Sequence, residues 1–148
     1  MALYFAYGSN MLSRQMEQRC PGAKPVDVGL LRGWRFLINR RGVASIVADE
    51  AGSVRGVVWE LTDGHLRSLD GYEGVPDWYR RRMVDVELPE RGEVACVTYI
   101  DESEGGDVPG PPREGYLEKI VEGAINFRLP PAYISFLRSF SAAPEDDT

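Results

Sequence analysis

Two short stretches carry residues whose types and spacing could do chemistry. The first is Tyr7-Gly8-Ser9-Asn10, which follows an apolar run of good β-formers. Gly8 permits a sharp turn, and Ser9 and Asn10 are good N-caps for a helix predicted over residues 11–20. A strand that turns at a glycine into a helix leaves backbone N–H groups unpaired, and these suit a carboxylate or another anion. The same pattern also fits an ordinary capped strand–turn–helix that binds nothing.

The second stretch places Glu73 between Gly71 and Gly74, in a segment predicted to be a loop. Glycines on both sides allow the backbone to aim one carboxylate into a cavity, and loops on a rigid scaffold often carry function. A carboxylate held in that way could transfer protons as a general acid or base. The alternative is a solvated surface charge, which is the usual state of a loop glutamate.

Other kinds of catalytic centre are disfavoured by composition. The chain has one histidine, His65, and two widely spaced cysteines, Cys20 and Cys96. These are too few ligands for a transition-metal site, and no second histidine exists to activate a Cys or Ser nucleophile. We therefore expect no metal and no cofactor, free thiols at both cysteines, and a surface position for His65.

Length, composition and charge limit the number of domains, the location and the kind of partner that we expect. The 148 residues, 43% of them hydrophobic, fit one soluble globular domain, which we place at residues 1–140 with a C-terminal tail at 141–148. No apolar run reaches membrane-spanning length, and the N-terminus lacks the pattern of a signal peptide, so we expect a cytoplasmic protein. The net charge of −6 disfavours nucleic acid or an anionic membrane as the main partner.

The elements that must position these residues are mainly strands. Apolar patterning predicts two strands around a turn or bulge at Gly33, a hairpin over residues 43–61 with its turn at 49–53, and a second hairpin over 77–100. Gly56 is a candidate bulge or close-approach point. Helices are predicted over 62–70, 114–127 and 132–140, and a long Gly- and Pro-rich loop over 101–112. The basic run at 39–41 is either a solvated strand end or an electrostatic lip for an acidic substrate.

Three sequence blocks make the chain similar to a known family. They are LYFAYGSN at Leu3–Asn10, RGVVWEL with SLDGYEGV at Arg55–Val75, and PPREGYLEKIVEGAINFRLPPAYISFL at residues 111–137. In this order and at this spacing, over almost the full length, they resemble the γ-glutamylcyclotransferase family. The resemblance implies an α+β fold, with a small, mostly antiparallel mixed β-barrel surrounded by helices.

The resemblance also implies a reaction. In this family the free α-amine of a γ-glutamyl group attacks its own γ-carbonyl, which releases 5-oxoproline and an amine or amino acid. By motif position, Glu73 corresponds to the general acid/base. The residues that correspond to substrate-binding positions are Tyr4, Phe5, Ala6, Tyr7, Gly8, Ser9, Asn10, Tyr99 and Tyr116. A small-molecule γ-glutamyl compound is therefore the expected partner, and a homodimer is the assembly that the resemblance allows.

The sequence leaves several alternatives for the leaving group, which is the part released from the γ-glutamyl unit, because the loop at 101–112 has no recognisable family pattern. The γ-glutamyl group could be joined to an amino acid or peptide, to an amine, or to a biosynthetic intermediate that it protects. A binding module of the same fold without catalysis is the alternative outside the enzyme class, and the presence of Glu73 argues against it.

Overall fold

A computed structural model describes residues 1–141 and contains five strands, four α-helices and one short 3-10 helix. Of the predicted C-terminal tail, residues 142–148 lie outside the described residues. In chain order the elements are β1 (Ala2–Ala6), η1 (Ser9–Met11), α1 (Ser13–Arg19), β2 (Lys24–Ile38), β3 (Ala44–Leu61), α2 (Asp63–Glu73), β4 (Tyr79–Leu88), β5 (Gly92–Asp101), α3 (Tyr116–Asn126) and α4 (Pro131–Arg138).

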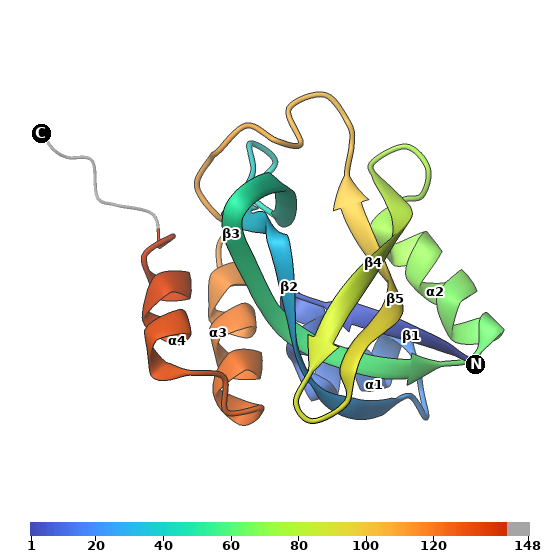
Figure 1. The fold of residues 1–148 in the computed structure, drawn as a ribbon. Helices are drawn as coiled ribbons and strands as arrows, with labels where there is room; N and C mark the ends of the chain where they lie inside the picture. Colours follow the sequence, from blue (N-terminus) through green and yellow to red (C-terminus); the bar gives the residue numbers. More distant parts are fainter. Residues whose placement is uncertain (142–148) are drawn as a thin grey trace, which may run out of the picture.

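The five strands close into a barrel in the order β1-β3-β2-β4-β5. Only the contact between β1 and β5 is parallel, and the other strand pairs are antiparallel. Helices α3 and α4 lie together on one side of the barrel and α2 lies on the other (Figure 1). Fully buried side chains on both faces of the strands, among them Phe5, Val57 and Leu61, form one hydrophobic core. The predicted α+β barrel with surrounding helices is confirmed.

The long strands β2 and β3 differ from the prediction in one respect. They form a single hairpin with each other, whereas the sequence pattern predicted that residues 43–61 fold back on themselves. Residues 49–52 stand opposite Gly33, since Arg32 pairs with Ser53 and Trp34 with Ala48. Gly33 has a φ of 89°, and the predicted bend there is a bulge inside one strand. The polar cluster at 49–53 is therefore an irregularity within β3, and the prediction of a hairpin turn there is wrong.

Helix α2, which carries Glu73, is longer than the helix predicted over residues 62–70. Thr62 caps α2 by accepting a hydrogen bond from the His65 backbone N–H, and the His65 side chain accepts from the Thr62 N–H. The helix continues through Gly71 and ends at Gly74, which adopts the left-handed conformation. Glu73 is thus the last residue of a helix, and the prediction that it lies in a loop is wrong.

The turn after β1 also differs in detail. Residues 9–11 form η1, and α1 begins only at Ser13 with Leu12 as its N-cap. The side chains of Ser9 and Asn10 cap neither helix, which corrects the prediction of a continuous capped helix over 11–20. Helix α3 packs on η1 at Gly123, where a Cβ would lie 2.7 Å from the Met11 carbonyl carbon. This close packing fixes the turn against the rest of the molecule.

Within residues 1–141, no helix has the length and apolar composition needed to cross a bilayer.

Candidate active site

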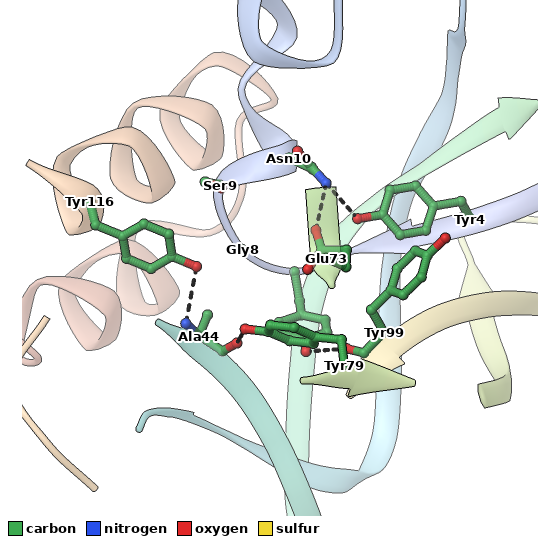
Figure 2. Close-up of a pocket in the computed structure, with 10 residues that line it drawn as sticks. Tyr4, Gly8, Ser9, Asn10, Ala44, Glu73, Tyr79, Tyr99 and Tyr116 are labelled. Carbon is green, nitrogen blue, oxygen red and sulfur yellow. Dashed lines mark hydrogen bonds between the residues drawn. The ribbon is translucent and has the colours of Figure 1, made fainter. Parts of the chain in front are cut away.

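A small polar pocket lies where the chain leaves β1, and Figure 2 shows the side chains that line it. Its lining contains five tyrosines and a single carboxylate, that of Glu73. The lining residues are Tyr4, Tyr7, Gly8, Ser9, Asn10, Ala44, Glu73, Tyr79, Tyr99 and Tyr116. Two segments about sixty residues apart, which the sequence singled out separately, therefore meet at one place.

Phe5 and Ala6 are the two predicted binding residues that the structure does not bring to the pocket. Both are buried in the hydrophobic core, with 0% and 1% of their surface exposed. The Phe5 carbonyl accepts a hydrogen bond from the Thr98 hydroxyl at 2.8 Å, which ties β1 to β5. These residues hold the strand in place, and the side chains of Tyr4 before them and Tyr7 after them reach the pocket.

Asn10 connects the turn to Glu73. Its Nδ2 donates to the Tyr4 hydroxyl at 3.0 Å and, at 3.5 Å, to Oε2 of Glu73 (Figure 2). Its Oδ1 accepts from Nε2 of Gln15 at 2.9 Å and from Nη1 of Arg19 at 3.2 Å. Because two donors face the oxygen, the amide is oriented with its nitrogen toward Glu73. The residue predicted as a helix cap is therefore a buried link between the turn and the carboxylate.

Glu73 is a largely buried carboxyl group close to an arginine. Its side chain is 16% exposed, and Nη1 of Arg19 lies 3.8 Å from Oε2. Burial raises the pKa of Glu73 to about 7, and the charges of Arg19 and Arg41 oppose that rise. A carboxyl group with this pKa is present in both protonation states near neutral pH, which is what an acid/base catalyst requires.

The tyrosines around Glu73 are held as neutral phenols. Burial, and then the charge of Glu73, raise the pKa of Tyr4 and of Tyr7 well above the usual value. The Tyr7 hydroxyl donates to the backbone carbonyl of Tyr99, and the Tyr79 hydroxyl donates to the Ala44 carbonyl at 2.5 Å. The Tyr116 hydroxyl accepts the Ala44 N–H at 3.0 Å (Figure 2). The pocket walls therefore carry no negative charge apart from that of Glu73.

Tyr99 is fixed by a charged pair behind the pocket. Its hydroxyl donates to Oδ1 of Asp70 at 2.8 Å, and Asp70 accepts two hydrogen bonds from the Arg81 guanidinium at 2.8 and 2.6 Å. Partial burial raises the pKa of Asp70, but the hydrogen bonds from Arg81 and Tyr99 outweigh it and hold that pKa below its usual value. Arg81 thus pairs with a carboxylate that holds a pocket tyrosine, whereas its neighbour Arg82 pairs with Glu102.

The backbone of the turn supplies donors for an anion. Among the described residues, the N–H groups of Ser9 and Asn10 have no hydrogen-bond acceptor, while the Met11 N–H bonds the Gly8 carbonyl at 3.0 Å. A Cβ at Gly8 would lie 3.2 Å from the Ala44 Cβ and 3.4 Å from the Tyr116 hydroxyl. Glycine at this position therefore keeps open the space between the turn, Ala44 and Tyr116.

A wider groove of about 460 Å³ adjoins the pocket and shares Ser9, Glu73, Tyr79 and Tyr116 with it. Arg41 lines the groove and pairs with the buried carboxylate of Asp101 at 2.6 Å. Of the two interpretations of the basic run 39–41, the position of Arg41 favours the electrostatic lip.

Sequence reasoning missed three residues near Glu73, which are Arg19, Ala44 and Tyr79, and indicated Arg41 only as part of a basic run. The basic run was the one signal, and it pointed to Arg41 without separating it from its neighbours.

Neither a metal cluster nor an active thiol is present in residues 1–141. No group of three or more His, Cys, Asp and Glu side chains there could hold a metal ion. Both cysteines are free and buried, and burial raises the pKa of Cys20 and of Cys96 to about 11. His65 lies away from the pocket, with Nε2 2.6 Å from the Pro21 carbonyl oxygen.

Comparisons with known proteins agree with this geometry. The model of the AIG2-like family matches residues 53–137. The human γ-glutamylcyclotransferase is 32% identical over 157 aligned residues, which cover 99% of this chain and 81% of the human protein. The bovine γ-glutamylcyclotransferase is also 32% identical, over 93% of this chain and 77% of that protein. A solved structure of a γ-glutamyl cyclotransferase superimposes with a TM-score of 0.88 at 28% identity and covers 99% of this chain and 92% of its own.

These matches span both sequence stretches that form the pocket. The family-model match includes α2 with Glu73, and the alignment with the human enzyme extends over the turn after β1 as well. The chain belongs to the γ-glutamylcyclotransferase, AIG2-like family.

Proposed function

We propose that this chain is a γ-glutamylcyclotransferase, which releases 5-oxoproline from a γ-glutamyl compound with Glu73 as the general acid/base. The observation that carries the proposal is a single buried carboxylate with a pKa of about 7 in a pocket otherwise lined by neutral donors. The relatives at 32% identity bear the name of this activity.

The reaction needs no external nucleophile. The α-ammonium group of the γ-glutamyl unit gives a proton to Glu73, and the amine nitrogen then attacks the γ-carbonyl carbon. A C–N bond closes the five-membered ring, and the protonated Glu73 returns its proton to the leaving nitrogen as the original amide C–N bond breaks. The ring nitrogen, which still holds one proton too many, gives it to Glu73, and Glu73 passes it to the released amine, which leaves as an ammonium ion while the carboxylate is restored. One carboxylate serves both steps, a contribution typically worth about 10²–10⁴-fold in rate.

The pocket residues would then bind and orient the substrate. The free N–H groups of Ser9 and Asn10 suit an anionic oxygen of the bound γ-glutamyl group. Tyr4 and Tyr116 present neutral phenols next to Glu73, and Arg19 fixes Asn10 while it limits the rise in the pKa of Glu73. Folding the substrate into a near-attack shape can supply on the order of 7–11 kcal/mol in favourable cases.

The proposal includes the organisation of the chain. We treat residues 1–140 as one catalytic domain, because the barrel and the flanking helices share one hydrophobic core. The two free, buried cysteines are consistent with a reducing compartment, so we propose a cytoplasmic enzyme that acts on a small molecule and not on nucleic acid. Homodimerisation stays a prediction, to be checked by sedimentation of the purified chain.

The test is removal of the proposed base without a change in its size. We expect Glu73→Gln to lower the turnover of a γ-glutamyl compound by about a hundredfold or more while folding is retained. Glu122→Gln is the matched control, because the Glu122 side chain is 43% exposed, pairs with Arg14 and lines neither the pocket nor the groove, and it should keep full activity. Release of 5-oxoproline at a near-normal rate by folded Glu73→Gln would exclude Glu73 from this role.

A further inference from the structure

Helix α2 carries two carboxylates near its end, and only that of Glu73 lines the pocket. Asp70 lies three residues before Glu73, about one helical turn away, so the placement of one determines that of the other. The Asp70 backbone carbonyl accepts the N–H of Gly74 and, at 3.0 Å, that of Val75, which closes the end of the helix. Asp70 therefore fixes both the start and the end of the short segment that contains Glu73.

The side chain of Asp70 attaches this segment to two strands of the barrel. Its carboxylate accepts hydrogen bonds from Nε and Nη2 of Arg81 on β4, at 2.8 and 2.6 Å, and from the Tyr99 hydroxyl on β5, at 2.8 Å. Arg81 and Tyr99 are partners in the antiparallel pairing of β4 with β5, so both side chains leave the same face of the sheet. We call these three residues the Asp70 network.

The contacts of the Glu73 carboxylate itself are long. Its Oε2 lies 3.5 Å from Nδ2 of Asn10 and 3.8 Å from Nη1 of Arg19, beyond the usual length of a strong hydrogen bond. Gly71 and Tyr72, which join Asp70 to Glu73, are exposed. The position of the carboxylate therefore depends on how the last turn of α2 is held.

The Asp70 network also reaches Glu73 through the pocket wall. The Tyr99 ring packs edge-on against the Tyr4 ring, with the ring centres 5.8 Å apart (Figure 2). The Tyr4 hydroxyl accepts a hydrogen bond from Asn10, whose Nδ2 also faces Glu73. The hydrogen bond from Tyr99 to Asp70 thus orients the wall beside Glu73 as well as the helix that carries it.

We infer that Asp70, held by Arg81 and Tyr99, is a positioning residue that keeps the Glu73 carboxylate at its place in the pocket. The inference rests on the proposed role of Glu73 and goes beyond it. Asp70 and Arg81 line neither the pocket nor the groove, so they act through the helix turn and not on the substrate.

The experiment breaks the network from its solvent side. The Arg81 side chain is 40% exposed, so Arg81→Gln removes its guanidinium without opening the pocket. We expect kcat for γ-glutamyl-alanine to fall by about 10- to 30-fold, because Glu73 no longer meets the reacting nitrogen in one fixed geometry. KM should change by less than about threefold, because the turn after β1 still binds the substrate.

A second variant tests whether Asp70 and Arg81 act as one unit. In Asp70→Asn/Arg81→Gln, kcat should be within about threefold of that of Asp70→Asn alone, because the network is already broken by the first change. If Arg81→Gln does not fold, Arg81→Lys takes its place. Lysine cannot make both hydrogen bonds of the guanidinium, and kcat should fall by about three- to tenfold.

The pH dependence separates a displaced Glu73 from a general loss of stability. Burial raises the pKa of Glu73 to about 7, so a side chain released toward solvent should titrate closer to its ordinary value of 4.5. In Asp70→Asn/Arg81→Gln the two charges are removed together, and the midpoint of kcat/KM should move down by about 1 pH unit. The titration of the Glu73 carboxyl carbon, followed by ¹³C NMR without substrate, should shift by the same amount.

The expected direction is opposite to that of a simple change in charge. Loss of Arg81 alone leaves the Asp70 carboxylate unpaired on the helix of Glu73, which would raise the pKa of Glu73. The other charged and titratable groups around Glu73 stay in all variants. They are Arg19 on α1, Arg41 between β2 and β3, and the pocket tyrosines Tyr4, Tyr7, Tyr79, Tyr99 and Tyr116.

Arg82 and Glu102 provide the matched control. Arg82 is the next residue of β4, and its Nε and Nη2 donate to Glu102 at 2.6 and 2.5 Å. Glu102 follows β5 and does not belong to α2, so this pair has the geometry of the Arg81 pair without the link to Glu73. Arg82→Gln/Glu102→Gln should therefore keep the wild-type kcat, KM and midpoint.

Three results would overturn the inference. The first is a wild-type kcat and midpoint in folded Arg81→Gln, which would leave the proposed function standing. The second is a loss in the double variant equal to the product of the two single losses, since the residues would then act independently. The third is an equal loss in the control pair. If the wild-type chain releases no 5-oxoproline, the proposed function fails, and the NMR titration still shows whether the Asp70 network holds Glu73.

Discussion

Replacing Arg19 by glutamine should move the pH dependence of the reaction in a known direction. Burial raises the pKa of Glu73 to about 7, and the Arg19 charge, 3.8 Å away, is the largest influence that holds it down. Glu73 must be deprotonated to accept the proton of the substrate ammonium group, so kcat/KM should rise with pH through a midpoint near 7. Without the Arg19 charge the carboxylate form is less stable, and the midpoint should move upward.

The size of the shift follows from the separation and exposure of the two groups. Two unit charges about 4 Å apart interact by about 1 kcal/mol in water and about 4 kcal/mol at an effective dielectric constant of 20. The side chains of Arg19 and Glu73 are 24% and 16% exposed, which places the pair between these limits. Since one pKa unit corresponds to about 1.4 kcal/mol, we expect the midpoint to rise by about 1 to 2 pH units.

The assay is kcat/KM for one γ-glutamyl compound measured from pH 5 to pH 10 at fixed ionic strength, on the order of 0.1 M. The α-amine of the substrate also titrates, but its pKa is common to all variants and cancels in the comparison. Arg14→Gln is the control, because Arg14 lies on the same helix, is exposed and pairs with Glu122. A midpoint that stays in place or moves downward in folded Arg19→Gln would refute this electrostatic coupling.

Three further predictions concern stability and can be measured by denaturant unfolding. Glu73 binds a proton more tightly in the folded chain than in the unfolded chain, so its contribution to stability falls as pH rises from about 4.5 to 7. Glu73→Gln should therefore stabilise the chain at pH 8 by roughly 1 to 3 kcal/mol. An unchanged or lower stability would contradict the burial of this charge. Asp101→Asn leaves the Arg41 guanidinium without its buried partner and should cost about 3 kcal/mol; a cost below about 0.5 kcal/mol would contradict that pairing. Gly56→Ala places a Cβ 2.3 Å from the Ala6 carbonyl oxygen and should destabilise the chain by several kcal/mol, about as much as a strongly overpacked core residue, whereas a neutral effect would contradict the close approach of β1 and β3.

The parts of the fold with a clear period could be predicted from sequence. The alternation at 77–100, the spacing of Leu117 and Ile120, and the capping signal at Thr62 all correspond to observed elements. The close approach predicted for Gly56 is also present, because a strand that crosses another backbone closely has no room for a side chain. Local rules succeed in these places because the tertiary structure agrees with them.

The errors lie where tertiary contacts overrode the local signal. The turn residues at 49–53 lie inside β3, since the partner strand β2 bends at Gly33 and accommodates them. The sequence predicted that the helix ends at residue 70, before Gly71, but α2 continues for three more residues to Glu73 and is capped by Gly74. The extension determines where the carboxylate points, which sequence spacing alone does not indicate.

The candidate site was predictable in part. Tyr7–Asn10 and Glu73 stand out because a glycine turn and a glycine-flanked acid are unusual, and the structure places both in one pocket. No local sequence pattern identifies Arg19 or Tyr79 as a site residue, since an arginine at a helix end and a tyrosine at a strand start are common. Their roles depend on contacts between residues far apart in the chain, such as that between Arg19 and Glu73.

The measurement that tests the central claim most directly is the identity of the product from a blocked and an unblocked substrate, compared by mass. In cyclotransfer the α-amine of the substrate is the nucleophile, so γ-glutamyl-alanine should give 5-oxoproline and alanine, with no glutamate as a primary product. The same compound with an acetylated α-amine should be inert, because its nitrogen cannot attack the γ-carbonyl carbon. Free glutamate from the unblocked compound, or turnover of the acetylated one, would contradict the account.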